Sequence, residues 1–152
     1  MCAPYATADQ VRAAIQTQHG GLRVILKDVA DAAARARAAG YDRSLLPALE
    51  RLLHDLANHM SFEELTLVPA LRERDPLGTD RGGAILEEHR RQRAELEAMT
   101  RLTAGGYHQR DLATAAQSFV TDVLLDMAHE ERSYLCEDVL HDDLIVAGQS
   151  GG

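Results

Sequence analysis

The chain has 152 residues, and 45% of them are hydrophobic, which suits a single domain with a full core. Its formal net charge of −8 argues against nucleic acid and anionic membranes as partners, because both are recognised by basic faces. Trp is absent, so the core must be built mainly from Leu, Ala, Val and Ile, a mixture that favours helices. No signal peptide or apolar membrane span is visible, and the two cysteines form no CxxC motif. We therefore expect a cytoplasmic protein.

The first predicted helix starts near residues 7–9 and runs to about residue 39, where Gly40 stops it. Its apolar residues recur every three or four positions and form one stripe along the helix. His19 falls on this stripe, four residues after Ile15 and three before Leu22. An imidazole is therefore expected inside the core.

The second predicted helix starts near Asp42 or Ser44 and carries His59 and Glu63. Residues four apart lie one above the other on the same helix face. Leucines continue that face above and below the pair, so an imidazole and a carboxylate share an apolar stripe. An unpaired ionised group buried there costs several kcal/mol or more, which calls for a compensating charge.

The third helix is predicted to begin after Asp80, a good N-cap, and to end at Gly105. His89 lies on its apolar stripe. The fourth helix is predicted over about residues 111–140, and its stripe is interrupted by the carboxylates of Asp126 and Glu130. Two further helices therefore also direct polar groups inward.

Four long helices with short connections predict an all-α, up-down-up-down four-helix bundle over about residues 7–141 of a single domain, with a disordered tail at 142–152. A weak internal repeat matches Gln18-His19 with Glu88-His89. It also matches the His59-x-x-x-Glu63-Glu64 segment with Asp126-x-x-x-Glu130-Glu131. Two facing hairpins would bring six groups to one level of the core: His19, His59, Glu63, His89, Asp126 and Glu130.

These six groups have the donor chemistry of a metal site. Imidazole and carboxylate ligands together suit iron, manganese or zinc. A bundle core with inward Glu and His from four helices is a known way to hold two such ions. One inward histidine is more often satisfied within a core than bound to metal. Six polar groups on four apolar stripes, at spacings that repeat, predict a dinuclear site.

The pattern of these residues resembles the haemerythrin-like (HHE cation-binding) domain. The resemblance covers about residues 10–140 and is carried by His19, the His59-x-x-x-Glu63-Glu64 motif with Pro69 downstream, Glu88-His89 and the last carboxylate pair. It implies a non-haem di-iron centre in a four-helix bundle, with an oxo or hydroxo bridge. It also implies Glu63 and Glu130 as bridging carboxylates.

The chain departs from the family at two positions. The well-known haemerythrins carry a second histidine one turn after that of the third helix, where this chain has Arg93. The family's last motif is HxxxE, and Asp126 stands at its histidine position, with His129 nearby. We expect Asp126 and Glu130 to be ligands. A competing interpretation takes Asp126-x-x-His129 as the ligand pair, as in ferritin-type bundles.

Three functions remain open at this point. The first is binding or sensing of O2, or of NO or iron, at the di-iron centre. The second is an enzyme that removes peroxide or oxidises Fe(II). The additional negative charge of Asp126, in place of a histidine, favours this second chemistry. The third is a helical bundle without metal. The short apolar patch at residues 143–148 could be a docking peptide, although a frayed terminus is favoured.

Overall fold

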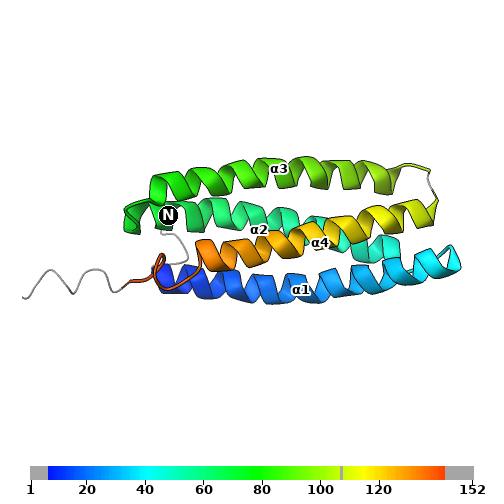
Figure 1. Ribbon diagram of the computed structural model, residues 1–152, viewed down its shortest axis with the longest axis horizontal. Helices are drawn as coiled ribbons and strands as arrows, with labels where there is room; N and C mark the ends of the chain where they lie inside the picture. The colour runs from blue at the N-terminus through cyan, green and yellow to red at the C-terminus, as the bar shows by residue number, and fades with distance from the viewer. Residues whose placement is uncertain (1–6, 107, 143–152) are drawn as a thin grey trace, which may run out of the picture.

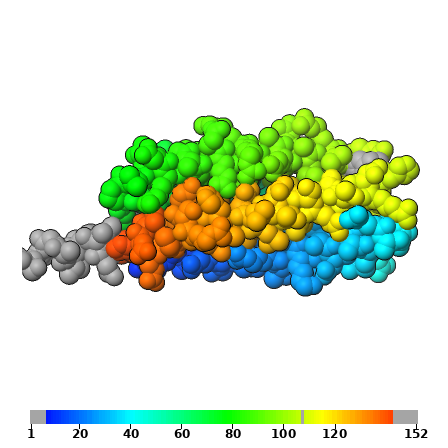
Figure 2. Space-filling view, in the orientation of Figure 1, coloured from blue at the N-terminus to red at the C-terminus, as the bar shows by residue number. Residues whose placement is uncertain are grey.

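The computed structural model describes residues 7–106 and 108–142, which form four long helices. Consecutive helices run antiparallel and lie along a common axis (Figure 1), so the predicted up-down-up-down bundle is confirmed. In the space-filling view, α4 lies across the front of the molecule between α3 and α1 (Figure 2). Among the described residues, no helix has the length and apolar character of a membrane span. The helices are α1 (Ala8–Ala39), α2 (Leu45–Arg74), α3 (Gly78–Ala104) and α4 (Gln109–Ser133).

Helix α1 begins and ends where the sequence predicted. The Thr7 hydroxyl accepts a hydrogen bond of 3.1 Å from the Gln10 amide, which satisfies one of the free N–H groups of the first turn. At the other end, Gly40 adopts φ 86°, a left-handed conformation that favours glycine, and its N–H bonds to the Ala36 carbonyl. These caps fix the register that turns His19 inward.

Helix α3 begins at Gly78, earlier than the predicted start after Asp80. The connection from α2 is so tight that a Cβ atom at residue 78 would lie 1.8 Å from the Leu71 carbonyl oxygen. Glycine therefore allows the helix to start directly against the end of α2. Asp80 falls within the first turn instead, where its charge suits the positive end of the helix dipole.

Helix α4 ends at Ser133, about two turns before the predicted end. The amides of Tyr134 and Leu135 both donate to the Glu130 carbonyl, at 2.8 and 3.1 Å, so the helical pattern stops there. The chain then folds over the end of the bundle and buries Leu135 and Leu140 in its core. Packing of these leucines outweighs the tendency of the sequence to continue the helix.

The described chain closes on the start of α1. The Asp142 carboxylate accepts hydrogen bonds from the amides of Ala8 and Asp9, at 2.9 and 3.2 Å, and pairs with Arg74 at 2.9 Å. Residue 142, expected in the disordered tail, therefore belongs to the folded part. The rest of that tail, residues 143–152, with the apolar patch at 143–148, lies outside the described residues.

A polar layer divides the core of the bundle into two apolar clusters. On α1, Ile15 belongs to the cluster under the C-terminal turns, Leu22 belongs to the cluster of the opposite end, and His19 lies between them. On α2, Met60 and Leu67 flank Glu63 in the same way. The layer that contains the predicted site is therefore shielded by hydrocarbon on both sides.

Candidate metal centre

The structure places five of the six predicted ligands in this layer. Their side chains are buried although each is polar or ionisable, and three are wholly inaccessible to solvent. They come from all four helices, because each helix presents its inward stripe at the same level. The five residues are His19, His59, Glu63, His89 and Glu130.

The imidazoles of α1 and α2 converge with two carboxylate oxygens. His19 Nε2 and His59 Nε2 are 3.1 Å apart. Glu63 Oε1 lies 3.2 Å from His59 Nε2, and Glu130 Oε2 lies 3.3 Å from His19 Nε2. One donor atom from each of the four residues lies within 4.8 Å of the other three. This arrangement has the donor types and the spacing that a metal ion requires.

The same two carboxylates also face the imidazole of α3. Glu63 Oε2 accepts a hydrogen bond of 3.1 Å from His89 Nε2, and Glu130 Oε1 lies 3.9 Å from the same nitrogen. Each carboxylate therefore turns one oxygen to the α1 and α2 imidazoles and the other oxygen to His89. Two cations could be bridged in this way.

Two carboxylate oxygens of the centre lack hydrogen-bond partners in the described part of the chain, Glu63 Oε1 and Glu130 Oε2. The imidazole nitrogens beside them are within ion-pair distance but are not aligned as hydrogen-bond donors. An unsatisfied buried carboxylate oxygen is destabilising, and buried polar atoms without partners are rare. A cation beside these oxygens would satisfy both, so the residues present fit a metal ion.

Each imidazole is held from behind through its Nδ1 atom. His19 Nδ1 bonds to Glu131 at 2.9 Å, and His89 Nδ1 bonds to Glu64 at 3.0 Å. Since a carboxylate can only accept, Nδ1 carries a proton and Nε2 is the nitrogen that faces the centre. His59 Nδ1 bonds in the same way at 2.7 Å to the neutral amide oxygen of Gln18.

Arginines fix the two outer glutamates. Arg23 Nη2 donates to Glu131 at 2.7 Å, and Arg93 donates through both terminal nitrogens to Glu64. Each arginine lies one turn after the histidine that its glutamate supports, on α1 and on α3. The residue at the position of the family's second histidine, Arg93, therefore supports the centre from outside.

Without a cation, the negative charge of the carboxylates in the centre is balanced by protons held on its imidazoles and carboxylates. Burial alone would lower the pKa of His19, but its contacts with Glu130, Glu63 and Glu131 outweigh burial and raise that pKa to about 10. Burial would raise the pKa of Glu63, yet three surrounding imidazoles hold it well below its usual range. Burial raises the pKa of Glu130. A bound cation would replace protons in the centre.

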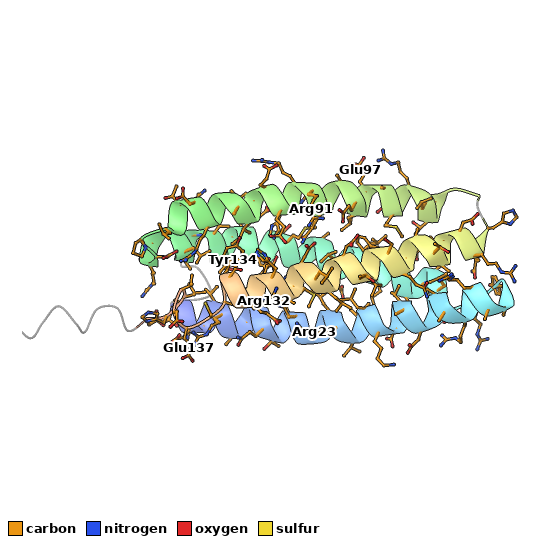
Figure 3. The ribbon with its side chains drawn as sticks, in the orientation of Figure 1. Arg23, Arg91, Glu97, Arg132, Tyr134 and Glu137 are labelled. Atoms are coloured by element: carbon orange, nitrogen blue, oxygen red, sulfur yellow. The ribbon has the colours of Figure 1, made fainter. Side chains whose placement is uncertain are left out.

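Asp126, the sixth predicted ligand, is not brought into this group. Arg91 Nη2 donates to both of its carboxylate oxygens at 2.9 Å, and Gln92 Nε2 donates to Oδ2 at 2.9 Å. Arg91 lies on α3 beside α4 in Figure 3. The sequence pattern missed this competition, because the partners lie on another helix. The role of Asp126 as a ligand stays a prediction.

The competing pair Asp126-x-x-His129 does not converge on the group either. The His129 side chain is 52% exposed, and its Nδ1 atom lies 3.9 Å from Glu88 Oε2. Glu88 is half-buried on the same side, and burial together with the charges of Glu130 and Asp126 raises its pKa to about 7. Several carboxylates therefore lie close together along the α4 edge of the centre. Their negative charge favours a positively charged guanidinium beside Asp126.

Sequence reasoning assigned no role to the residues that support the imidazoles, although the internal repeat contains their signal. A doubled glutamate occurs on α2 and on α4, and in each pair the second glutamate supports a histidine of another helix. An arginine follows His19 and His89 at the same spacing of four. The supporting residues are Gln18, Arg23, Glu64, Arg93 and Glu131.

Comparison with known proteins agrees with this geometry. The family model described as hemerythrin HHE cation binding domain matches residues 10–137, nearly the whole described chain. No match was found among curated proteins. Solved structures gave no match either.

Proposed function

Because the chain belongs to the hemerythrin HHE cation-binding family, we propose that it is a non-haem di-iron protein that binds or senses O2. The same proposal includes NO, or iron itself, as the species that the protein binds or senses. The observation that carries it is the pair of buried, unpaired oxygens on Glu63 and Glu130, which face imidazoles of α1 and α2. Within the described part of the chain neither oxygen accepts a hydrogen bond, and a cation would satisfy both.

The proposed ligands divide between the two iron ions. His19 and His59 would hold one ion, and His89 would hold the other. Glu63 and Glu130 would contribute one oxygen to each ion. When bound, iron in such a site supplies reversible exchange of electrons with a small diatomic ligand. The protein orients the imidazoles through Nδ1 and packs an apolar cluster on each side of them.

The surroundings of the centre favour binding over oxidation chemistry. Three imidazoles and two carboxylates face inward, so the donor set is richer in nitrogen than the carboxylate sites of ferritin-like bundles. The additional charge expected from Asp126 is neutralised by Arg91. Removal of peroxide and oxidation of Fe(II) are therefore the second function, which the experiment below distinguishes.

The metal content tests the proposal directly. Protein reconstituted with Fe(II) without oxygen should retain about two iron equivalents per chain. His59→Ala and Glu63→Ala should lose most of this iron with little change in helix content by circular dichroism. The matched control is His54→Ala, because His54 is exposed on the same helix. Unchanged iron in both variants would contradict the assignment.

Mixing the reduced, iron-loaded protein with O2 separates the two functions. A stable charge-transfer band that disappears on deoxygenation would support binding or sensing. Continuous consumption of O2 or peroxide, with release of product over many turnovers, would show the enzyme instead.

A further inference from the structure

The two sides of the centre offer unequal donor sets. The α1–α2 side consists of His19 Nε2, His59 Nε2, Glu63 Oε1 and Glu130 Oε2. The α3 side consists of His89 Nε2, Glu63 Oε2 and Glu130 Oε1. One side therefore has two nitrogens and two oxygens, whereas the other has a single nitrogen and two oxygens.

No other described residue supplies a second imidazole to the α3 side. The repeat places Asp126 where His59 stands on the α1–α2 side, and Asp126 is held by Arg91 and Gln92. His129 is half-exposed and faces Glu88. Even if Asp126 turned inward, it would add oxygen rather than nitrogen. The inequality of the two sides does not depend on its position.

The two sides also differ in how many of their carboxylate oxygens have hydrogen-bond partners when no cation is bound. Both unpaired oxygens, Glu63 Oε1 and Glu130 Oε2, lie on the α1–α2 side. A cation there replaces the contact between His19 and His59 and satisfies both oxygens. On the α3 side, a cation replaces the hydrogen bond from His89 to Glu63 Oε2, which is already formed. The gain is therefore larger on the α1–α2 side.

We propose that the centre fills in two unequal steps, the first cation entering the α1–α2 side and the second binding more weakly on the α3 side. The inference rests on the proposed metal-binding function and extends it. When metal is limiting, the protein is a single-metal centre. The α3 side, with mainly oxygen donors, discriminates less against harder cations such as Mn²⁺, so mixed pairs can form.

Titration of metal-free protein with Co²⁺ tests the order of filling. Calorimetry and the visible bands of cobalt should resolve two steps whose dissociation constants differ by roughly tenfold or more, as expected when one nitrogen ligand is missing. His59→Gln should remove the tight step. His89→Gln should keep the tight step and lose the weak one. His54→Gln, on the exposed face of α2, should change neither.

Proton NMR of the unmodified protein gives a second readout that does not depend on variants. The Nδ1 protons of His19, His59 and His89 are each held by a hydrogen bond, so their signals should be observable and shifted by paramagnetic cobalt. Two ligand N–H signals should take the large contact shifts of coordinated imidazoles with the first equivalent of cobalt. The third should show only a smaller through-space shift until the second equivalent, when it takes a contact shift as well.

The outcomes separate this inference from the function on which it rests. A single step of two equal equivalents, or loss of the tight step in His89→Gln, would overturn the order of filling. Saturation at one cobalt per chain would overturn the second position. If no cobalt bound at all, the proposed metal-binding function would itself be wrong.

Discussion

Each imidazole of the centre is oriented by one residue that accepts a hydrogen bond from its Nδ1 atom, on the side away from the centre. Glu131 and Glu64 are anionic, whereas Gln18, behind His59, is neutral. An anionic acceptor on Nδ1 makes the opposite nitrogen a stronger ligand. His19 and His89 are therefore supported more strongly than His59. This support matters most on the α3 side, where His89 is the only imidazole among the described residues.

Removing the charge behind an imidazole should weaken metal binding without removing a ligand. We expect Glu131→Gln and Glu64→Gln each to lower metal affinity by about 10–100-fold, the usual effect of such outer partners. Competition with a chelator of known affinity measures the change. Glu97→Gln is the control, since Glu97 is exposed on α3 (Figure 3) and its ion pair with Arg101, at 3.5 Å, lies in solvent. Equal affinity in all three variants would show that the outer glutamates merely pack.

At the scale of the helices, the connection between α2 and α3 determines where His89 lies relative to Glu63. Helix α2 ends at Arg74, and α3 begins only four residues later. The close approach of Gly78 to the Leu71 carbonyl sets the distance between the two helices at this end. The register of α3, which turns His89 toward Glu63, begins from this contact.

A methyl group at Gly78 should disturb this connection. We expect Gly78→Ala to lower the free energy of unfolding of the metal-free protein by about 2 kcal/mol or more, because its Cβ would collide with backbone. Gly83→Ala is the matched control on the same helix, where a Cβ meets nothing within 4 Å. It should raise the free energy of unfolding by about 0.5–1 kcal/mol, the helix preference for alanine. Urea denaturation followed by circular dichroism measures both.

Across the whole molecule, a charged layer lies between two apolar clusters. The clusters hold the four helices together at both ends, so the fold does not depend on metal alone. The layer between them contains buried carboxylate oxygens that no described residue satisfies. Stability and metal binding are therefore coupled, because a cation binds the folded layer and not the unfolded chain.

Metal removal should lower the melting temperature. At a free metal concentration one hundred times the dissociation constant, binding stabilises the folded state by about 2.7 kcal/mol. For a chain of this size, this corresponds to a shift of about 5 °C or more. Calorimetry with and without chelator measures the shift, and His59→Ala should show little of it. A metal-free protein as stable as the loaded one would mean that the layer is satisfied by its own protons.

The sequence by itself determined which side chains turn into the core. The helical period depends only on local backbone geometry, so the stripes of apolar residues identify His19, His59, Glu63, His89 and Glu130 as inward. The same stripes predicted the four-helix bundle, which the structure confirms, and the residues resembled the family that the comparison shows.

The tertiary structure alone decided what happens at Asp126 and at the ends of two helices. Asp126 shares a face with Glu130, yet Arg91 and Gln92 reach it from α3, a contact between helices that no local period contains. Helix α4 stops at Ser133 because the following leucines pack onto the bundle end, although no proline or glycine marks the stop. The face of a helix on which a residue lies follows from its spacing along that one helix. The partner of a side chain depends on which helix lies beside it.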